Sequence, residues 1–225
     1  MKNYFFSEVR RKLKKLVRRR RWDERIHFNT DTIFNGHLQV TYRGLATIKC
    51  PFDFVLYQMI VADVKPDLII EIGTNKGGSA LYLGDLLETI GHGTVHSIDI
   101  ENCSDKLLSD HPRIKLFHDG YEGYDISLTA GFEKILVIED GSHLYEHVCG
   151  SLRKFSPVVS KDSYFIVEDG VVDKLGMSRG YHGGPLRAIR EFMAEENDFI
   201  IDRKWCDFFG RNATFNVNGY LKKVK

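Results

Sequence analysis

Short apolar runs alternate with amphipathic segments through most of the chain. Residues 67–72 have the length and composition of a buried strand, and residues 79–88 follow with helical spacing. Similar apolar runs lie at residues 94–99, 114–118, 135–139 and 164–168, with helical stretches between them. Strands that are nearly all apolar and alternate with helices are typical of a parallel sheet covered on both faces. The pattern therefore predicts a doubly wound α/β fold with a mostly parallel sheet.

The two ends of this pattern predict further elements. Residues 52–61 have helical spacing and follow Pro51, and residues 185–196 form a second such segment. Residues 199–202 and 214–217 have the composition of strands and are separated by a hairpin-like link. This ending places an antiparallel strand at or near the edge of the sheet.

Length and composition set limits on the class of protein. The chain has 225 residues, enough for one well-buried core and few for two, and its 43% hydrophobic and 28% charged residues are those of a globular protein. No apolar run reaches the roughly 20 residues that cross a bilayer, and the N-terminus lacks the apolar core of a secretory signal. The four cysteines are widely separated, without the spacing of a zinc site. We therefore expect a cytoplasmic protein with reduced cysteines.

The small net charge of +1 conceals two oppositely charged parts. Residues 1–25 contain eleven Lys and Arg against three acids, a net charge of +8, which leaves the remaining 200 residues at −7. Apolar side chains recur at helical spacing through this leader, at Tyr4, Phe5, Phe6, Val9, Leu13, Leu16 and Val17. The sequence thus predicts a basic amphipathic helix over residues 1–25, followed by one domain over residues 26–225.

Such a helix has several possible partners. It can lie on the anionic inner face of a membrane, which would make the protein peripheral there, or it can bind nucleic acid, the less favoured partner. It can equally be a solvated helix that packs on the domain or on a partner subunit of a homo-oligomer.

The carboxyl ends of the first two predicted strands carry a candidate ligand site. In an open α/β sheet, ligands bind beyond these ends, where the strand order reverses. The first strand ends in the glycine-rich segment 71–79, and the second ends in Asp99, which can accept hydrogen bonds from both hydroxyls of a ribose. Dinucleotide sites use the spacing GxGxxG, whereas this loop has GxxxGG with Glu71 before it. A carboxylate at that position would repel a pyrophosphate and suits a sulfonium or ammonium ligand.

The candidate ligand-binding residues follow the first three strands. They are Glu71, Gly73, Asn75, Gly77, Gly78, Ser79, Asp99, Asp119 and Gly120. The alternative interpretation is a ligand-free turn that requires glycine for its geometry alone.

Acidic residues also end the fourth and fifth strands. Asp140 follows one strand, and Glu168 and Asp169 follow the next, so neighbouring parallel strands would bring three carboxylates to one edge. Such a cluster is unstable unless protons or a cation neutralise it, and all-oxygen ligands are typical of Mg²⁺. The alternative is that the acids cap the following helices. His143, three residues after Asp140, can face a metal-bound substrate and accept its proton, although a lone histidine is usually structural.

Several ordered motifs resemble the cephalosporin hydroxylase family over roughly residues 40–223. They are segments 66–74 and 77–79, Asp140-Gly141-Ser142-His143, segment 163–169, Gly184-Pro185-Leu186, segment 189–192 and Asn218-Gly219-Tyr220-Leu221. Despite its name, that family has the Rossmann-like class I methyltransferase fold, and it resembles Mg²⁺-dependent O-methyltransferases that act on macrolide sugars and rhamnosyl groups.

The resemblance implies S-adenosylmethionine and Mg²⁺ as cofactors. By motif, Asp140, Glu168 and Asp169 would hold the metal ion, and His143 would be the base. The basic leader is not part of the family pattern, and Glu139 adds a fourth carboxylate that can compete as a ligand.

The function implied is methylation of a hydroxyl on a sugar or a secondary metabolite. The acceptor would be a small molecule or a glycan, for example a cell-surface polysaccharide or lipopolysaccharide, and the predicted lid and pocket segments 27–50 and 171–184 carry no motif that identifies it. One alternative is a hydroxylase, although iron oxygenases prefer two histidines and one carboxylate. The other is a non-catalytic S-adenosylmethionine-binding accessory protein of glycan assembly.

Overall fold

A computed structural model describes residues 26–103 and 105–225 of the chain. Residues 34–225 form one compact unit, which begins within helix α2 (Thr30–His37). The predicted helix of the basic leader lies outside the described residues, and the division at residue 25 stays a prediction. Of the helices in the described part of the chain, none has the length and apolar character required to cross a membrane.

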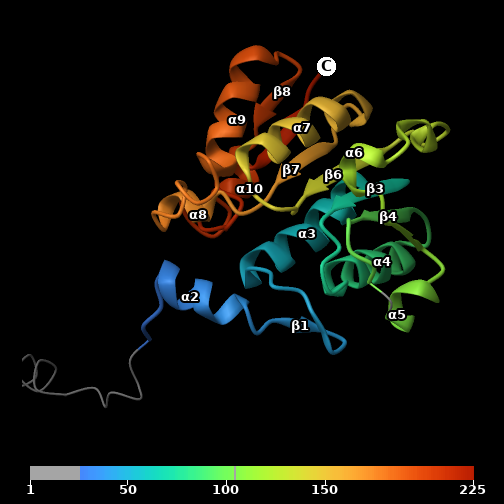
Figure 1. The fold of residues 1–225 in the computed structure, drawn as a ribbon, viewed down its shortest axis with the longest axis horizontal. Coiled ribbons are helices and arrows are strands. Elements are labelled where there is room, and N and C mark those ends of the chain that lie inside the picture. Colours follow the sequence, from blue (N-terminus) through green and yellow to red (C-terminus); the bar gives the residue numbers. More distant parts are fainter. Residues whose placement is uncertain (1–25, 104) are drawn as a thin grey trace, which may run out of the picture. The chain divides into compact units, whose positions relative to one another are not determined.

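The compact unit is built on a seven-stranded sheet with the order β5-β4-β3-β6-β7-β9-β8 (Figure 1). Its strands are β3 (Leu68–Ile72), β4 (Thr94–Ile98), β5 (Ile114–Phe117), β6 (Ile135–Glu139), β7 (Tyr164–Val167), β8 (Phe199–Ile201) and β9 (Tyr220–Lys223). Strands β3 to β7 pair in parallel, and β9 pairs antiparallel with both β7 and β8. The predicted doubly wound sheet with an antiparallel ending is therefore confirmed.

The apolar runs are strands because both of their faces are buried. Successive side chains of a strand point to opposite faces, and Ile69 of β3 belongs to one core cluster while Leu68 and Ile70 belong to the other. Helices α3 (Pro51–Val64) and α4 (Gly78–Ile90) supply the first cluster. Helices α7 (Tyr145–Phe155) and α9 (Gly184–Glu195) supply the second.

Helices α3 and α4 lie over the predicted helical segments 52–61 and 79–88 and extend beyond them at both ends. Pro51 occupies the first turn of α3, where its missing N–H costs nothing, and Lys65 ends the helix in a left-handed conformation before Pro66. Helix α4 begins after left-handed Gly77 and ends at left-handed Gly91.

Short elements complete the fold. They are the hairpin of β1 (Thr41–Tyr42) and β2 (Leu45–Ala46), helices α5 (Lys106–Ser109), α6 (Gly120–Gly123), α8 (Val171–Lys174) and α10 (Arg203–Cys206), and the 3-10 turns η2 (Ile126–Thr129) and η3 (Ser156–Val158).

The last predicted strand is wrong in position. Residues 214–217 form a buried turn, and the strand lies at Tyr220–Lys223 instead. The reason is a side chain from α3: the Asp53 carboxylate accepts hydrogen bonds from the Phe215 N–H, at 3.0 Å, and from the Thr214 hydroxyl. A backbone amide used in this way is not available for a sheet ladder.

The chain reverses direction across the sheet at β3. Strand β4 lies on one side of β3 and β6 on the other, so the connections that follow β3 and β6 leave a crevice at the carboxyl ends of the strands. Six of the nine predicted ligand-binding residues line this crevice, together with Asp140 and Asp169 of the predicted metal ligands.

Candidate active site

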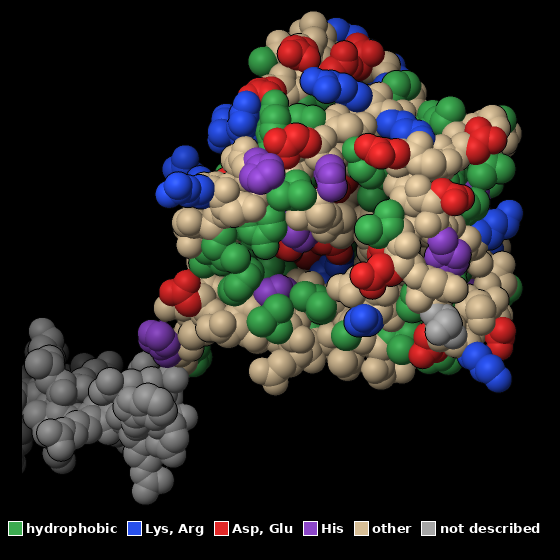
Figure 2. Space-filling view, viewed as in Figure 1, with side chains coloured by type: hydrophobic (Ala, Val, Ile, Leu, Met, Phe, Trp, Pro, Cys, Tyr) green, Lys and Arg blue, Asp and Glu red, His purple; other side chains and the backbone are tan. Residues whose placement is uncertain are grey.

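A cavity of about 490 Å³ opens at the carboxyl ends of the central strands. Gly73 after β3, Asp99 after β4, Asp140 after β6 and Asp169 after β7 all line it. Figure 2 shows the hollow, in which acidic and histidine side chains gather. Its volume lies within the range of small-molecule and cofactor sites.

Six of the nine predicted ligand-binding residues line this cavity. They are Gly73, Asn75, Ser79, Asp99, Asp119 and Gly120. Glu71 lies behind the wall, fully buried, where its carboxylate accepts a hydrogen bond from the Ser97 hydroxyl at 2.7 Å. Burial raises the pKa of Glu71 to about 7, against the lowering effect of its hydrogen bonds to Ser79 and Ser97.

The remaining two predicted residues, Gly77 and Gly78, serve the packing of the loop. A Cβ on Gly77 would meet the Leu108 side chain at 2.0 Å, and one on Gly78 would meet the Ala46 carbonyl oxygen at 2.5 Å. Glycine is needed at both positions for close approach, which is the structural alternative considered for this loop.

Asp99 is held in place by backbone amides of the cavity wall. One carboxylate oxygen accepts a hydrogen bond from the Asn75 N–H at 2.8 Å, and the other accepts from the N–H groups of Ile100 and Glu101 at 2.7 and 3.1 Å. Each carboxylate oxygen can accept more than one hydrogen bond. The fixed carboxylate therefore keeps capacity for ligand hydroxyls.

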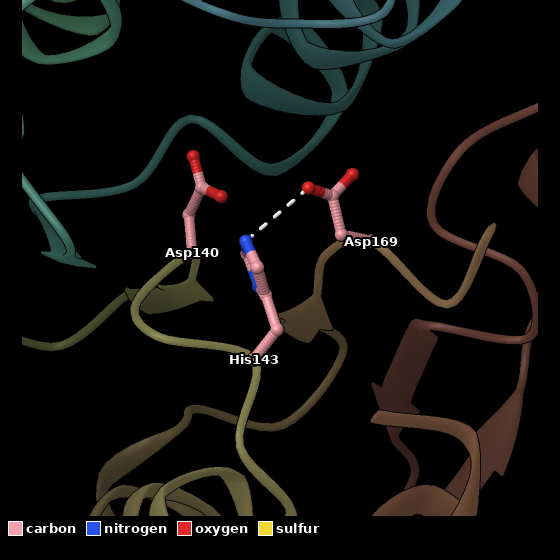
Figure 3. A group of neighbouring side chains, drawn as sticks. All are labelled: Asp140, His143 and Asp169. Carbon is pink, nitrogen blue, oxygen red and sulfur yellow. Dashed lines mark ion pairs between the residues drawn. The ribbon is translucent and has the colours of Figure 1, made fainter. Parts of the chain in front are cut away.

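Asp140, His143 and Asp169 form a compact group at the end of β6 and β7 (Figure 3). One ligand atom from each lies within 4.8 Å of the others, and His143 Nε2 is 3.3 Å from Asp169 Oδ2. His143 and Asp169 both have positive φ, at 58° and 54°. Non-glycine residues adopt this conformation at a cost of about 1–3 kcal/mol, and such strain clusters at functional sites.

The chemistry of this group fits a hard divalent cation. Two carboxylates and one imidazole nitrogen converge, and each is only partly exposed. Burial raises the pKa of Asp169, and the neighbouring His143 works against this rise. A bound cation would stabilise the ionised carboxylates in such surroundings.

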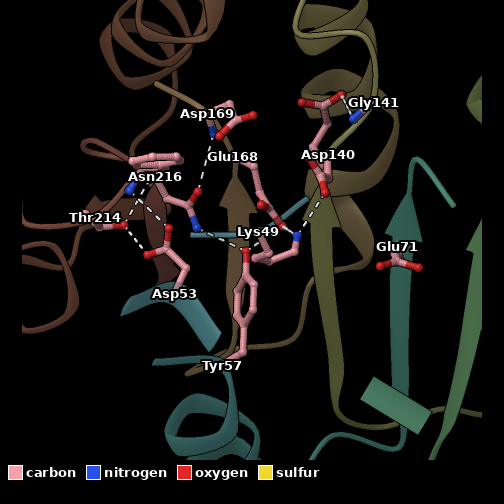
Figure 4. A network of polar contacts seen from close by, with 12 residues as sticks. Lys49, Asp53, Tyr57, Glu71, Asp140, Gly141, Glu168, Asp169, Thr214 and Asn216 are labelled. Carbon is pink, nitrogen blue, oxygen red and sulfur yellow. Dashed lines mark hydrogen bonds and ion pairs between the residues drawn. The ribbon is translucent and has the colours of Figure 1, made fainter. Parts of the chain in front are cut away.

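Glu168 lies outside this group and takes part in a buried network (Figure 4). Its Oε1 accepts hydrogen bonds from the Lys49 ammonium at 2.5 Å and from the Tyr57 hydroxyl at 2.6 Å. Burial raises the pKa of Glu168 well above its usual range. The predicted role of Glu168 as a metal ligand stays a prediction.

Lys49 is the residue that the sequence analysis missed. Its ammonium also donates to Asp140 Oδ2 at 2.8 Å, so it bridges acids from two neighbouring strands. Burial works to lower the pKa of Lys49, but the two carboxylates beside it raise the pKa above its usual value. A single lysine between Ile48 and Cys50, far from the acidic motifs in sequence, gives no sign of this contact. Its apolar neighbours are a weak indication that the side chain is buried.

Glu139, the fourth carboxylate, is the last residue of β6 and is 1% exposed. One of its oxygens accepts a hydrogen bond from the Gly141 N–H at 3.3 Å, and the structure places the side chain outside the Asp140, His143 and Asp169 group. Burial raises the pKa of Glu139 to about 7.

Comparison with known proteins identifies the family. A model of the rhamnosyl O-methyltransferase/CmcI family matches residues 36–224. The chain belongs to this family. The family predicted from the motifs is thus confirmed, and so is the predicted class of enzyme, an S-adenosylmethionine-dependent O-methyltransferase.

Two relatives share most of their length with this chain. Rhamnosyl O-methyltransferase of Mycobacterium bovis (strain BCG / Pasteur 1173P2) is 29% identical over 195 residues, which cover 81% of this chain and 78% of that protein. Rhamnosyl O-methyltransferase of Mycobacterium leprae (strain TN) is 28% identical over 203 residues, which cover 80% of this chain and 82% of that protein.

Solved structures of CmcI share the fold. A CmcI structure described with Mg and SAM superposes with a TM-score of 0.63 at 20% identity, covering 84% of this chain and 78% of that one. A CmcI structure with SAH has a TM-score of 0.64 at 20% identity and covers 91% of both chains. At this identity the likeness concerns the fold alone, and it confirms the predicted class I methyltransferase fold.

Proposed function

We propose that this protein transfers the methyl group of S-adenosylmethionine to a hydroxyl of a sugar, with Mg²⁺ held by Asp140 and Asp169 beside His143. The observation that carries the proposal is the position of these three residues, which line the same cavity as the glycine-rich loop and Asp99. A methyl donor and an ion bound there would lie side by side. The related CmcI structure described with Mg and SAM supports this pairing.

The loop after β3 and Asp99 would hold the methyl donor. The Asp99 carboxylate, fixed by three backbone amides, would accept hydrogen bonds from the ribose hydroxyls. Gly73 lines the cavity with a positive φ, and the carboxyl group of Glu71 is buried next to this loop, where a negative charge would suit a sulfonium or ammonium ligand.

Asp140 and Asp169 would hold the ion, and His143 would receive the proton of the acceptor hydroxyl. When bound, the ion supplies the positive charge that lowers the pKa of an alcohol. The hydroxyl oxygen then forms a bond to the methyl carbon as the carbon–sulfur bond breaks, and the electron pair of that bond stays on sulfur. His143 Nε2 takes the proton, and Asp169, 3.3 Å away, stabilises the resulting imidazolium.

The composition of the group favours transfer over hydroxylation. Iron oxygenases use two histidines and one carboxylate, whereas this group has one histidine and two carboxylates. This composition favours the transferase over the hydroxylase, and the relatives named as methyltransferases favour it over a non-catalytic accessory protein.

The acceptor class rests on the relatives, which are named for methylation of rhamnosyl groups. A sugar of a surface glycan or of a secondary metabolite fits this chemistry. The basic leader, with a net charge of +8, would hold the enzyme at the inner face of a membrane while it modifies such an acceptor.

Calorimetric titration with S-adenosylmethionine and S-adenosylhomocysteine, with and without Mg²⁺, tests the cofactor. We expect binding to the native protein and its loss in Asp99→Ala. Rhamnosyl acceptors are then incubated with protein and methyl donor, and the methylated product is detected by mass spectrometry. The absence of donor binding to folded protein would overturn the proposal, whereas binding without turnover across acceptors would favour the accessory protein.

A further inference from the structure

The proposed reaction makes no use of Lys49, although this residue is a cation inside the site. Its side chain is 2% exposed, and its ammonium contacts Asp140 and Glu168, with the Tyr57 ring 5.3 Å away. A lysine is almost never buried unless it is paired, because removing its charge from water is costly. The two carboxylates are the pairing that keeps it there.

The position of Lys49 changes the charge balance of the site. When all three are ionised, Asp140, Glu168 and Asp169 together carry three negative charges, and Lys49 compensates one of them. The two negative charges that are left equal in number the positive charge of one divalent ion. A second effect is geometric, because the ammonium and the Tyr57 hydroxyl both bind Glu168 Oε1 and hold it outside the Asp140, His143 and Asp169 group.

The backbone that presents Lys49 is itself strained. Ile48, the preceding residue, has a φ of 47°, which is an outlier for a β-branched side chain. Thr47 and Ile48 line the cavity, and the segment connects β2 to α3. Strain of this kind persists only where the surrounding contacts enforce it, and the next residue, Lys49, is anchored by its ion pairs with Asp140 and Glu168.

We propose that Lys49 is a built-in counter-cation that competes with the divalent ion for Asp140 and Glu168. It keeps the acids assembled when no ion is bound, and it weakens metal binding so that the ion remains exchangeable. This inference rests on the metal-assisted reaction proposed above, and it assigns Lys49 a positioning role.

The test measures the affinity of the protein for Mn²⁺ by the loss of the free-ion signal in electron paramagnetic resonance, with S-adenosylhomocysteine present. Lys49→Met removes the competing charge and releases Glu168, so we expect Mn²⁺ to bind at least about tenfold more tightly. Lys49→Arg keeps the charge and should stay within about threefold of the native protein. The matched control is Lys204→Met, since Lys204 also pairs with an acid, Asp63, but at the surface.

A double variant ties the gain in affinity to Glu168. In Lys49→Met/Glu168→Gln the released carboxylate is removed, and most of the gain should disappear. In thermal unfolding, Mn²⁺ should raise the Tm of Lys49→Met by more than that of the native protein. If Lys49→Met does not fold, Lys49→Gln replaces it, because the amide still donates hydrogen bonds without a charge.

The outcomes separate the two proposals. If the native protein binds Mn²⁺ and folded Lys49→Met binds it equally or more weakly, the role of Lys49 is wrong and the metal-assisted reaction stands. If neither protein binds Mn²⁺, the metal site fails and the role of Lys49 fails with it.

Discussion

Gly73 lies where the backbone after β3 passes close to the backbone after β6. Its φ is 103°, and a Cβ there would lie 2.1 Å from the Asp140 carbonyl oxygen. Gly73→Ala should therefore destabilise the protein by more than about 3 kcal/mol, because both strain and a backbone clash oppose it. Gly91→Ala is the matched control: φ is 92° but nothing lies within 4 Å, so about 1 kcal/mol is expected. Urea unfolding measures the loss of stability in both variants. Equal losses would contradict the close approach of Gly73 to the Asp140 carbonyl.

The buried carboxyl group of Glu71 makes stability depend on pH. In the unfolded chain this group ionises near pH 4.5, whereas in the folded protein its pKa is about 7. Between these values the folded state holds the extra proton, so the free energy of unfolding falls as pH rises from 4.5 to 7.

Glu71→Gln cannot titrate, and it should reduce the fall in stability across this window by about 2–3 kcal/mol. Urea unfolding at several pH values, without cofactor, measures the effect. The control is the same substitution at exposed Glu195, the last residue of α9. A Glu71→Gln protein with the native pH dependence would show that this carboxyl is ionised when folded.

Which site residues can be predicted from sequence depends on how the chain presents them. Asp140 and Asp169 directly follow apolar runs, and since the carboxyl ends of parallel strands meet at one edge, their proximity follows from the pattern alone. Lys49 and Tyr57 reach the same site from the linker before α3 and from α3 itself. Their positions depend on how α3 packs against the sheet, which local sequence does not encode.

At the scale of elements, one buried carboxylate ties α3 to the chain segment that precedes β9. Asp53 accepts hydrogen bonds from the Thr214 hydroxyl, from the Phe215 N–H at 3.0 Å and from the Tyr220 hydroxyl at 2.9 Å. Burial raises the pKa of Asp53 to about 6, against the lowering effect of these hydrogen bonds. The segment is thereby fixed as a turn, and the strand starts only at Tyr220.

Thr214→Val keeps the shape of the side chain and removes the hydroxyl that donates to Asp53. Because a buried acceptor then loses a partner, the free energy of unfolding should fall by about 1–3 kcal/mol. Thr89→Val is the control, since the Thr89 hydroxyl bonds the Asp85 carbonyl on an exposed helix surface, and its cost should stay within about 0.5 kcal/mol. If chemical denaturation gives the same loss in free energy of unfolding for both variants, the buried hydrogen bond to Asp53 stabilises the protein no more than an exposed one.

This link also explains the error in strand position. Residues 214–217 have strand composition because they are buried, as Thr214, Phe215, Asn216 and Val217 all are. Burial and strand pairing produce the same apolar pattern, so the sequence alone does not separate a buried turn from a strand. The central strands were predictable because each is followed by a glycine-rich or acidic turn at the edge of the sheet.

At the scale of the whole molecule, the charge of the chain is divided between its first 25 residues and the rest. Residues 1–25 carry +8 and the other 200 residues carry −7. The two core clusters and the candidate site lie within residues 34–225. We therefore expect a chain that begins at residue 26 to fold and to bind S-adenosylmethionine.

The same division predicts how the protein behaves at a membrane surface. The full chain should sediment with anionic vesicles at low salt and be released as salt is raised, because each cation near such a surface contributes about 1 kcal/mol and is screened by ions. Residues 26–225, with a net charge of −7, should stay in solution. Neutral vesicles are the control for both. If instead deletion of residues 1–25 changes the oligomeric state in size-exclusion chromatography and leaves vesicle binding unaltered, the leader contacts a partner subunit.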